Sequence, residues 1–451
     1  MDTLEIIKTI EKYTGSHIKF GVIDIDGVLR GKMISKKKFL KSVDKDIGFC
    51  NVIFGWDVND QVYDDSKVTG WHTGFPDSSA AIDLSTYRTI PWNDNIPLFL
   101  ADFHQSDDLS VVCPRSLLKR IGDRCRNAGY IPKFASEYEW FNFRETPQSL
   151  KQKGMVDPEP LTPGMFGYSL LRSSQYHDFM SGIAGQLESF GVPVEGIHTE
   201  TGDGVYEACI EYSDLIEAAD RSMLFKSGVK EIAFQHDIVA SFMAKWSDDL
   251  PGCGGHVHQS LWNSDESDNL FFSSGPGNDL PPILEHYIAG QLHCLPDILP
   301  MYAPTVNSYK RFVSGSWAST SVSWGRSNRT TALRVIPGGE ESARLETRVP
   351  GADANPYLSM AASLASGLYG IENKLTLDIF ETQGNEYQNP KSQSLPANLK
   401  DAASRMKLSE LAKELFGDAF VEHFVYTREW EWEQFSKRVT DWELKRYFEI
   451  I

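Results

Sequence analysis

The sequence FASEYEWFNF, residues 134–143, is an aromatic stretch whose pattern is typical of a β-strand. Glu137 and Glu139 lie two positions apart in it, and side chains two apart in a strand share one face. Such acidic pairs are common on solvated strand faces. Here aromatic residues flank both carboxylates, which makes simple exposure a poor explanation. The pair is therefore a candidate for a functional site.

A second acidic pair brackets a loop that contains two glycines. Glu200 and Glu207 lie on either side of the tetrapeptide TGDG at 201–204. The glycines allow a tight loop that would bring both carboxylates to one cation. By itself, this pattern favours an ordinary turn with two exposed acids. Its weight as a site therefore depends on the other patches.

Two histidines follow a run of glycines. Residues 252–255 are GCGG, and they lead into His256 and His258 within the strand-like segment GGHVHQSLW. Both imidazoles share one strand face, where one would ligate a metal and the other would hydrogen-bond a phosphate. The glycines permit close backbone approach to a ligand. A structural role for the histidines stays open as the alternative.

Arginines gather towards the end of the chain. Those within one stretch of fewer than forty residues include Arg311, Arg329, Arg334, Arg344 and Arg348. Strand alternation places Arg344, Glu346 and Arg348 on one face. A structural ladder of salt bridges is one explanation. Phosphoryl transfer, however, needs guanidinium groups around the migrating group, and five are more than a ladder requires.

The patches together predict a divalent-metal site. Converging carboxylates repel one another unless cations hold them. An oxygen-rich set with a single imidazole suits Mg²⁺ or Mn²⁺ better than a structural zinc site. The chain has no GxxxxGK[ST] motif, so an enzyme that uses ATP would hold its phosphates through metals and arginines. If the patches meet in space, they favour phosphoryl transfer.

Composition argues against several other classes of protein. The net charge of −18 disfavours nucleic acid as the main partner. No run of 18 apolar residues occurs, and the first residues lack the features of a signal peptide, so we expect no membrane span. The six cysteines have no paired spacing, which favours reduced thiols and a cytoplasmic location.

The order of elements predicts an α+β fold. A helix over 1–14 precedes a β-hairpin over 17–35, with Asp26 and Gly27 at its turn. Strand-like pieces follow at 80–85 and 97–103. Helical patterns lie at 114–129, 213–233, 352–374 and 395–416. The plan is a small β-rich N-terminal domain over 1–107 and a large α+β domain over 108–451.

A set of motifs runs through the chain in a specific order. They are DIDGVLRGK, DDSKVTGW, PDSSAAIDLST, EYEWF, TETGDGVYE, GCGGHVHQSL, NSYKR, GRSNRTTALRV, RLETRVPGADANPYL and GLYGIENK. In this order the chain resembles the type I glutamine synthetases and their relatives over essentially its whole length. The resemblance implies a β-grasp-like first domain and a catalytic domain with an antiparallel sheet flanked by helices. It also implies a homo-dodecamer of two stacked hexameric rings, with active sites between neighbouring subunits.

The resemblance further implies roles for the patches. Glu139, Glu200 and Glu207 would hold one Mg²⁺ or Mn²⁺ ion, and Glu137, His256 and Glu346 would hold a second, which bridges the phosphates of ATP. His258 and Ser260 would lie beside the nucleotide. Arg329 and Arg334 would stabilise the transferring phosphoryl group, and Arg311 and Arg348 would bind glutamate and its activated carboxylate.

One position departs from the pattern of the family's ammonia-using enzymes. Six residues after Arg311, where those enzymes carry a glutamate, this chain has Trp317. That glutamate takes a proton from ammonium, which an indole does not do. An indole instead offers an apolar wall or a cation–π face to an organic amine. The acid that helps to bind ammonium on the neighbouring subunit corresponds to Asp64.

We therefore expect an ATP-dependent ligase that joins the γ-carboxylate of glutamate to an organic amine or polyamine through γ-glutamyl phosphate. A plain glutamine synthetase, with Asp64 or Asp77 as proton acceptor, is the main alternative. A non-catalytic structural relative is a weaker one, because all six metal-ligand positions are kept. A carboxylate donor other than glutamate also stays open, although Arg311 and Arg348 favour glutamate.

Overall fold

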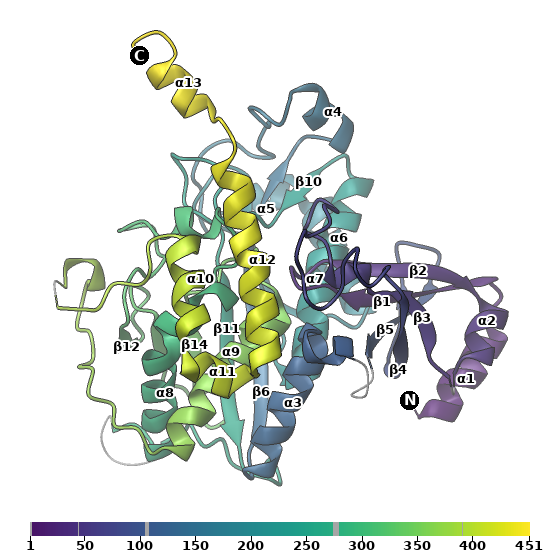
Figure 1. Ribbon diagram of the computed structural model, residues 1–451, viewed down its shortest axis with the longest axis horizontal. Helices are drawn as coiled ribbons and strands as arrows, with labels where there is room; N and C mark the ends of the chain where they lie inside the picture. The colour runs from purple at the N-terminus through teal and green to yellow at the C-terminus, as the bar shows by residue number, and fades with distance from the viewer. Residues whose placement is uncertain (1, 44, 104–107, 274–278, 390) are drawn as a thin grey trace.

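The smaller of two sheets is built from the first hundred residues. The computed structural model describes residues 2–43, 45–103, 108–273, 279–389 and 391–451 (Figure 1). After α1 (Thr3–Lys12) come β1 (His17–Ile23), β2 (Leu29–Ser35), α2 (Lys36–Lys41), β3 (Ile47–Cys50), β4 (Asp77–Ile90) and β5 (Ile96–Phe103). The strand order is β2-β1-β5-β4-β3, with β1 parallel to β5. The expected hairpin and β-grasp-like sheet are confirmed, and Gly27 takes a left-handed φ of 78° at the turn.

The larger sheet carries the candidate site. Its order is β12-β13-β14-β11-β6-β8-β7, and two short strands, β9 and β10, also pair with β6. These strands are β6 (Ile131–Phe143), β7 (Val194–Thr199), β8 (Val205–Ile210), β9 (Ser213–Asp214), β10 (Val239–Ser241), β11 (Gly255–Trp262), β12 (Trp324–Arg326), β13 (Leu333–Ile336) and β14 (Arg344–Thr347). Every pairing is antiparallel except that of β12 with β13. The predicted antiparallel sheet is thus confirmed.

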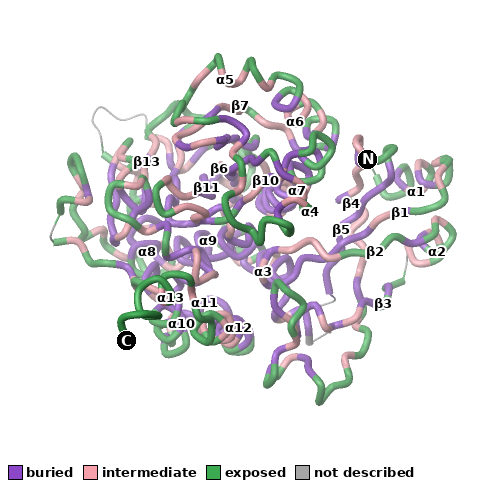
Figure 2. Tube along the Cα trace, turned by 90° about the horizontal axis from the view of Figure 1, so that it is seen from above, coloured by how far each residue is buried: buried purple, intermediate pink, exposed green. Residues whose placement is uncertain are grey.

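Helices cover one face of this sheet and leave the other for the site. Helices α3 (Pro114–Asn127), α7 (Leu215–Gln235) and α9 (Pro356–Glu372) pack against it, and α8 (Pro282–Ile298) packs on α9. On β6, the Tyr138 ring stacks on Phe225 of α7, and Ser136 accepts a 2.9 Å hydrogen bond from Ser222. Strand alternation therefore turns Glu137 and Glu139 to the opposite face. The buried core follows α9 and the strands beneath it (Figure 2).

Buried ion pairs tie the small sheet to the helices. The fully buried Arg115 of α3 lies 2.9 Å from Asp83 and Asp102 of the small sheet and 2.9 Å from Asp220 of α7. Arg428 of α12 (Asp418–Ser436) pairs with Asp26 beside the hairpin turn. A buried charge needs such partners, so these contacts hold the two sheets in one relative position.

Most predicted helices are confirmed, and one is corrected. The pattern over 395–416 suggested one amphipathic helix, but the structure has two, α10 (Leu399–Leu408) and α11 (Glu410–Phe416). The helical conformation is interrupted at Ser409, whose hydroxyl accepts a 3.1 Å hydrogen bond from the Ala412 amide and caps α11. The remaining helices are α4 (Pro147–Gln152), α5 (Leu170–Gln175), α6 (His177–Ser189) and α13 (Asp441–Tyr447).

Two further expectations concern the domain boundary and membrane-spanning helices. The domain boundary placed after residue 107 falls at 104–107, outside the described residues, and stays a prediction. Within the part of the chain that the structure describes, no helix combines the length and the apolar character that crossing a bilayer requires.

Candidate active site

Strand register brings the sequence patches together. Glu137 of β6 lies opposite His256 of β11, and Glu139 lies opposite Glu207 of β8. On the far side of β11, His258 lies opposite Glu346 of β14. Directly opposite residues on neighbouring strands have Cβ atoms about 5 Å apart. Four adjacent strands thus place acids and imidazoles on one continuous patch of the sheet.

The glycine loop at 201–204 completes the acidic cluster. Gly202 and Gly204 take φ values of 145° and 75°, and a Cβ at Gly204 would lie 2.6 Å from the Asn142 carbonyl oxygen. This tight loop returns the chain so that Glu200 and Glu207 approach each other. One oxygen of each lies within 4.8 Å of the other and of a His198 ring nitrogen. The expected closure of the loop is therefore seen, with His198 as an added donor.

The glycines before the histidines also bring two backbone segments together. A Cβ at Gly255 would lie 2.6 Å from the Gly351 carbonyl oxygen, so the close approach there is between two backbone segments. Gly254 forms a β-bridge with Gly351, and its amide donates to the Glu139 carboxylate. The glycine run thus lets the segment around Gly351 pack on β11, and it orients Glu139, one of the candidate metal ligands.

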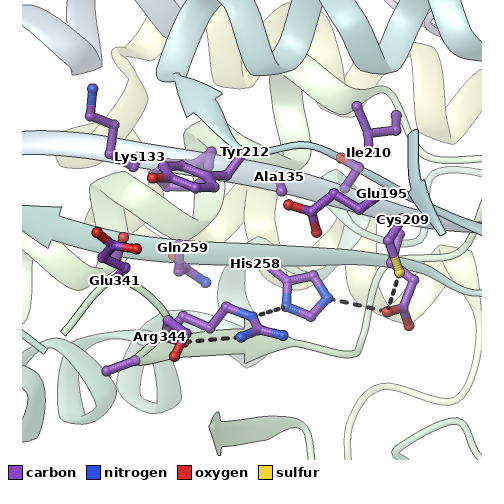
Figure 3. Close-up of a pocket in the computed structure, with 16 residues that line it drawn as sticks. Lys133, Ala135, Glu195, Cys209, Ile210, Tyr212, His258, Gln259, Glu341 and Arg344 are labelled. Carbon is purple, nitrogen blue, oxygen red and sulfur yellow. Dashed lines mark hydrogen bonds and ion pairs between the residues drawn. The ribbon is translucent and has the colours of Figure 1, made fainter. Parts of the chain in front are cut away.

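The two histidines share Glu137 between them. The His256 Nδ1 atom lies 2.9 Å from Glu137 Oε1 and 3.3 Å from Glu346 Oε1. The His258 Nε2 atom lies 3.5 Å from Glu137 Oε2, and Arg344 Nε donates to His258 Nδ1 at 3.1 Å (Figure 3). Since Nδ1 accepts this hydrogen bond, a neutral His258 carries its own proton on Nε2, facing Glu137. Carboxylate oxygens of Glu137 and Glu346 come within 4.8 Å of each other and of a His258 nitrogen.

A first cavity adjoins this cluster. Its lining includes Glu137, Cys209, His258, Ser260 and Arg344 (Figure 3). The Cys209 thiol donates to Glu137 Oε2 at 3.3 Å, and burial raises the pKa of that thiol. His258 and Ser260, expected beside the nucleotide, therefore open into one pocket.

A second cavity of about 400 Å³ adjoins the same cluster. It is lined by Glu137, Glu139, Tyr168, Glu200, Thr201, Val205, Glu207, Pro251, Gly252, His256, Arg311, Ser316, Trp317, Arg329, Arg334 and Arg348. Glu137 lines both cavities and so stands between them. Four predicted arginines thus face four predicted glutamates across one space.

Glu346 links the arginines to the acidic cluster. Its fully buried carboxylate lies 3.0 Å from Arg334 Nη1 and 2.6 Å from Arg348 Nη1. Arg348 also donates to the Trp317 carbonyl oxygen at 3.5 Å. Arg311 is buried and donates to the carbonyl oxygens of Val349 and Arg348, at 3.0 and 3.4 Å. Burial lowers the pKa of Arg311.

The electrostatics of the cluster fit divalent cations. Burial, together with repulsion from Glu137 and Glu139, raises the pKa of Glu207 to about 8 despite its contact with His198. Burial works in the same direction at Glu346, but Arg348 and the two histidines outweigh it and bring the pKa to about 2. A carboxylate whose pKa is raised by burial and by repulsion would ionise readily beside a cation. The oxygen-rich donor set with imidazole suits Mg²⁺ or Mn²⁺.

One predicted residue lies away from the cavity, and three residues were missed. Asp64 is exposed and does not line the second cavity of its own chain. His198, Tyr168 and Cys209 contribute to the site without having been singled out from the sequence. Cys209 lies two positions from Glu207 on β8, so strand alternation alone could have found it.

The fold combines a β-grasp-like sheet with a larger, mostly antiparallel sheet. Acids, imidazoles and guanidinium groups lie together on one face of the larger sheet, and this combination defines a class of enzyme suited to divalent metals and phosphate. The particular family follows from the comparison with known proteins. Residues 111–447 match the glutamine synthetase catalytic domain, and the chain belongs to the glutamine synthetase family. Members of this family are ATP- and metal-dependent ligases of glutamate.

Relatives include enzymes with different names. The chain is 49% identical to a type-1 glutamine synthetase 2 of Dictyostelium discoideum, over 99% of this chain and 86% of that protein. It is 37% identical to a glutamate–isopropylamine ligase of Pseudomonas sp., over 99% and 98% of the two chains. A gamma-glutamylethanolamide synthetase of Streptomyces coelicolor is 34% identical, over 94% and 91%. The solved structure of a GmaS/ADP complex superposes with a TM-score of 0.85 at 26% identity, covering 98% and 99% of the chains.

Proposed function

We propose that this protein is an ATP-dependent glutamate–amine ligase whose acceptor is an organic amine or polyamine. The observation that carries the proposal is Trp317 at the cavity where the family's ammonia-using enzymes have a glutamate. An indole takes no proton from ammonium, but it offers an apolar surface to a substituent on nitrogen. The relatives named for isopropylamine and for ethanolamide support an organic acceptor.

In this proposal the arginines and the acidic residues of the larger sheet carry out the first step, which is phosphoryl transfer from ATP to glutamate. Arg311 and Arg348 hold glutamate with its γ-carboxylate towards the cluster, and that carboxylate attacks the terminal phosphorus of ATP, so that ADP leaves. Arg329 and Arg334 stabilise the charge on the transferring phosphoryl group. Glu139, Glu200 and Glu207, and separately Glu137, His256 and Glu346, would hold two divalent ions, which neutralise phosphate charge.

The second step, amide formation, takes place at the cavity mouth. The product of the first step, γ-glutamyl phosphate, has a good leaving group that a bare carboxylate lacks. The free base of the amine attacks the carbonyl carbon, phosphate leaves and takes up the proton that the nitrogen loses, and an amide forms. Trp317 and the other residues around it exclude water and position the amine nitrogen.

A glutamine synthetase that uses ammonia is the second candidate. The 49% identical relative carries that name, which favours this alternative. Asp64 or Asp77 would then replace the missing glutamate as proton acceptor. Both readings share the first half of the reaction and differ in the acceptor alone.

A panel of amines distinguishes the two candidate functions. Glutamate-dependent phosphate release would be measured with ammonia, methylamine, isopropylamine, ethanolamine and 1,4-diaminobutane, each with saturating ATP. The proposal expects kcat/KM for at least one organic amine to exceed that for ammonia. The variant Trp317→Glu should move the preference back towards ammonia. High efficiency with ammonia alone would refute the organic-amine proposal.

The proposal includes a dodecamer with shared sites. Asp64 lies outside the cavity of its own chain, and it would reach the cavity mouth of a neighbouring subunit. The six described cysteines are free thiols, which suits the cytoplasmic location that we also propose.

A further inference from the structure

Cys209 brings a thiol to the cluster of proposed metal ligands. It lies opposite Glu137 in the pairing of β8 with β6, and Glu137 lies opposite His256 in the pairing of β6 with β11. The three side chains therefore form one row across three strands. Glu207, two residues before Cys209 on β8, points to the same face of the sheet. Strand register thus places the thiol among the carboxylates.

The thiol faces both a carboxylate and a cavity. Its Sγ atom donates to Glu137 Oε2 at 3.3 Å (Figure 3). Cys209 is half-buried and lines the first cavity, so a cation that enters this cavity reaches the sulfur. Of the other five cysteines, four are buried, and Cys50 donates to the Phe75 carbonyl oxygen at 3.5 Å. Cys209 therefore combines an acidic neighbour with access from a cavity.

Three donor atoms from these strands suit one cation. The Cys209 sulfur and one carboxylate oxygen each from Glu137 and Glu207 lie within 4.8 Å of one another. Zinc–sulfur and zinc–oxygen bonds are ~2.3 and ~2.1 Å long, so small rotations of the side chains bring all three atoms onto one ion. Sulfur is a poor ligand for Mg²⁺, which takes oxygen, and a good one for Zn²⁺ and Cd²⁺. The fourth position of a tetrahedral ion would stay open to water from the cavity.

We infer that Cys209, Glu137 and Glu207 bind a thiophilic divalent cation such as Zn²⁺ or Cd²⁺, and that this cation inhibits the enzyme. The site itself follows from the geometry of the sheet. The inhibition rests on the proposed function, in which Glu207 holds one catalytic Mg²⁺ or Mn²⁺ ion and Glu137 holds the other. A thiophilic cation would take one ligand from each, so it and the pair of catalytic ions exclude each other.

Binding of the cation removes the proton of the thiol. The S–H bond breaks, a metal–sulfur bond forms, and the proton passes to the buffer. Burial disfavours the thiolate of Cys209 and raises the pKa of the thiol, but the positive charge of the ion compensates for this. The ion also offsets the repulsion between Glu137 and Glu207. Both effects favour binding.

A cadmium titration tests the site. A cadmium–thiolate bond has a charge-transfer band in the ultraviolet, which identifies sulfur as a ligand. Full-length protein in Mg²⁺-free buffer should develop this band with one equivalent of Cd²⁺ per chain, and added Mg²⁺ should reduce it. Cys209→Ser should lose the band and bind Cd²⁺ about 100-fold more weakly by calorimetry. Cys50→Ser, at a half-buried thiol of the small sheet, is the matched control and should keep both.

Two results would overturn the site. One is the absence of the band in the parent protein. The other is an undiminished band in folded Cys209→Ser and Cys209→Ala, with circular dichroism as the check of folding for both variants. A band that Mg²⁺ leaves unchanged would contradict the sharing of Glu137 and Glu207 between the thiophilic cation and the catalytic ions.

Inhibition is measured separately, as glutamate-dependent phosphate release at fixed ATP, Mg²⁺ and amine, relative to the rate of each protein without Cd²⁺. Half-inhibition should need about 100-fold more Cd²⁺ in Cys209→Ser than in the parent or in Cys50→Ser. Equal sensitivity of the parent and Cys209→Ser would overturn the inhibitory role, even with the thiolate band present. Absence of phosphate release with every amine and with ammonia would refute the proposed function instead and leave the spectroscopic test of the site unaffected.

Discussion

At the residue scale, Glu346 joins the two halves of the site. Its buried carboxylate contacts Arg334, Arg348 and His256, and Arg348 in turn reaches the Trp317 carbonyl oxygen. A single carboxylate thus connects the proposed metal cluster with the loop at the cavity mouth. A change at Glu346 should therefore disturb both the phosphoryl-transfer groups and the amine side.

Replacing Glu346 by glutamine tests this role. Glu346→Gln keeps the shape of the side chain but leaves two guanidinium groups without their anionic partner. We expect kcat to fall about 100-fold or more, because both the metal donor set and the arginine positions change. Phosphate release gives the rate, and circular dichroism checks folding. Glu340→Gln, at an exposed acid nearby, is the control; a folded Glu346→Gln enzyme at near-normal rate would contradict the role.

His423 of α12 makes the stability of the protein sensitive to acid. It is buried, neither ring nitrogen has a hydrogen-bond partner among the described residues, and burial, followed by repulsion from Arg428, lowers its pKa to about 3. Unfolded histidine titrates near pH 6.5, so between pH 6.5 and about 3 the unfolded chain binds the extra proton. The free energy of unfolding therefore falls as pH drops through this window.

The variant His423→Phe removes that proton-linked loss. From pH 8 to pH 4.5 the parent protein should lose about 3 kcal/mol more stability than the variant, at ~1.4 kcal/mol per pH unit below 6.5. Urea unfolding at the two pH values measures the difference. Identical losses in the parent and the variant would show that His423 accepts a proton in the folded protein.

At the element scale, alternation along each strand was readable from the sequence, whereas pairing between strands was not. Which face Glu137 and Glu139 share is a local property of β6, so it was predicted correctly. That His198 faces Glu207 depends on the register of β7 against β8, which includes an irregularity near Gly196. The position of Tyr168 depends on its own left-handed backbone conformation, and a tyrosine in the sequence gives no sign of such a conformation.

Helices α8 and α9 meet at backbone distance through glycines. A Cβ at Gly370 of α9 would lie 2.0 Å from the His286 carbonyl oxygen of α8, and one at Gly290 would lie 2.3 Å from the Ser366 carbonyl oxygen. Backbone atoms of packed helices have no rotamer through which to yield. The two glycines therefore set the distance between the helix that covers the sheet and its neighbour.

Gly370→Ala should lower the free energy of unfolding by about 3 kcal/mol, because the methyl group forces the helices apart. Thermal or urea unfolding of the variant measures the loss. Gly185→Ala is the matched control, since Gly185 lies on the exposed side of α6 and a Cβ there meets nothing within 4 Å. That change should add up to about 1 kcal/mol. Equal effects at the two sites would contradict the close helix contact.

At the scale of the whole molecule, the order of motifs predicted the family and the two-sheet fold. Those motifs span the chain, and a solved structure of a relative superposes over 98% of it. The acceptor was not predictable in the same way, because the cavity mouth combines loops from distant segments. In the proposed oligomer, a neighbouring subunit adds to it as well.

Subunit sharing has a direct genetic test. Asp64→Asn and Glu346→Gln would each inactivate the enzyme alone, but they would damage different sides of a shared site. Co-expressed in one mixed oligomer, they should restore roughly a quarter of the parent activity, since that fraction of sites combines an intact Asp64 with an intact Glu346 from its neighbour. No recovery in a mixed oligomer would place both residues in one chain's site.

The measurement closest to the central claim is a competition for one activated intermediate. Enzyme, ATP, Mg²⁺ and glutamate would be supplied with ammonia and n-butylamine at equal free-base concentrations, and mass spectrometry would quantify the two products. The ratio of γ-glutamylbutylamide to glutamine then equals the ratio of the two kcat/KM values. The account predicts that γ-glutamylbutylamide predominates. Glutamine as the main product would contradict it and identify an ammonia-using enzyme.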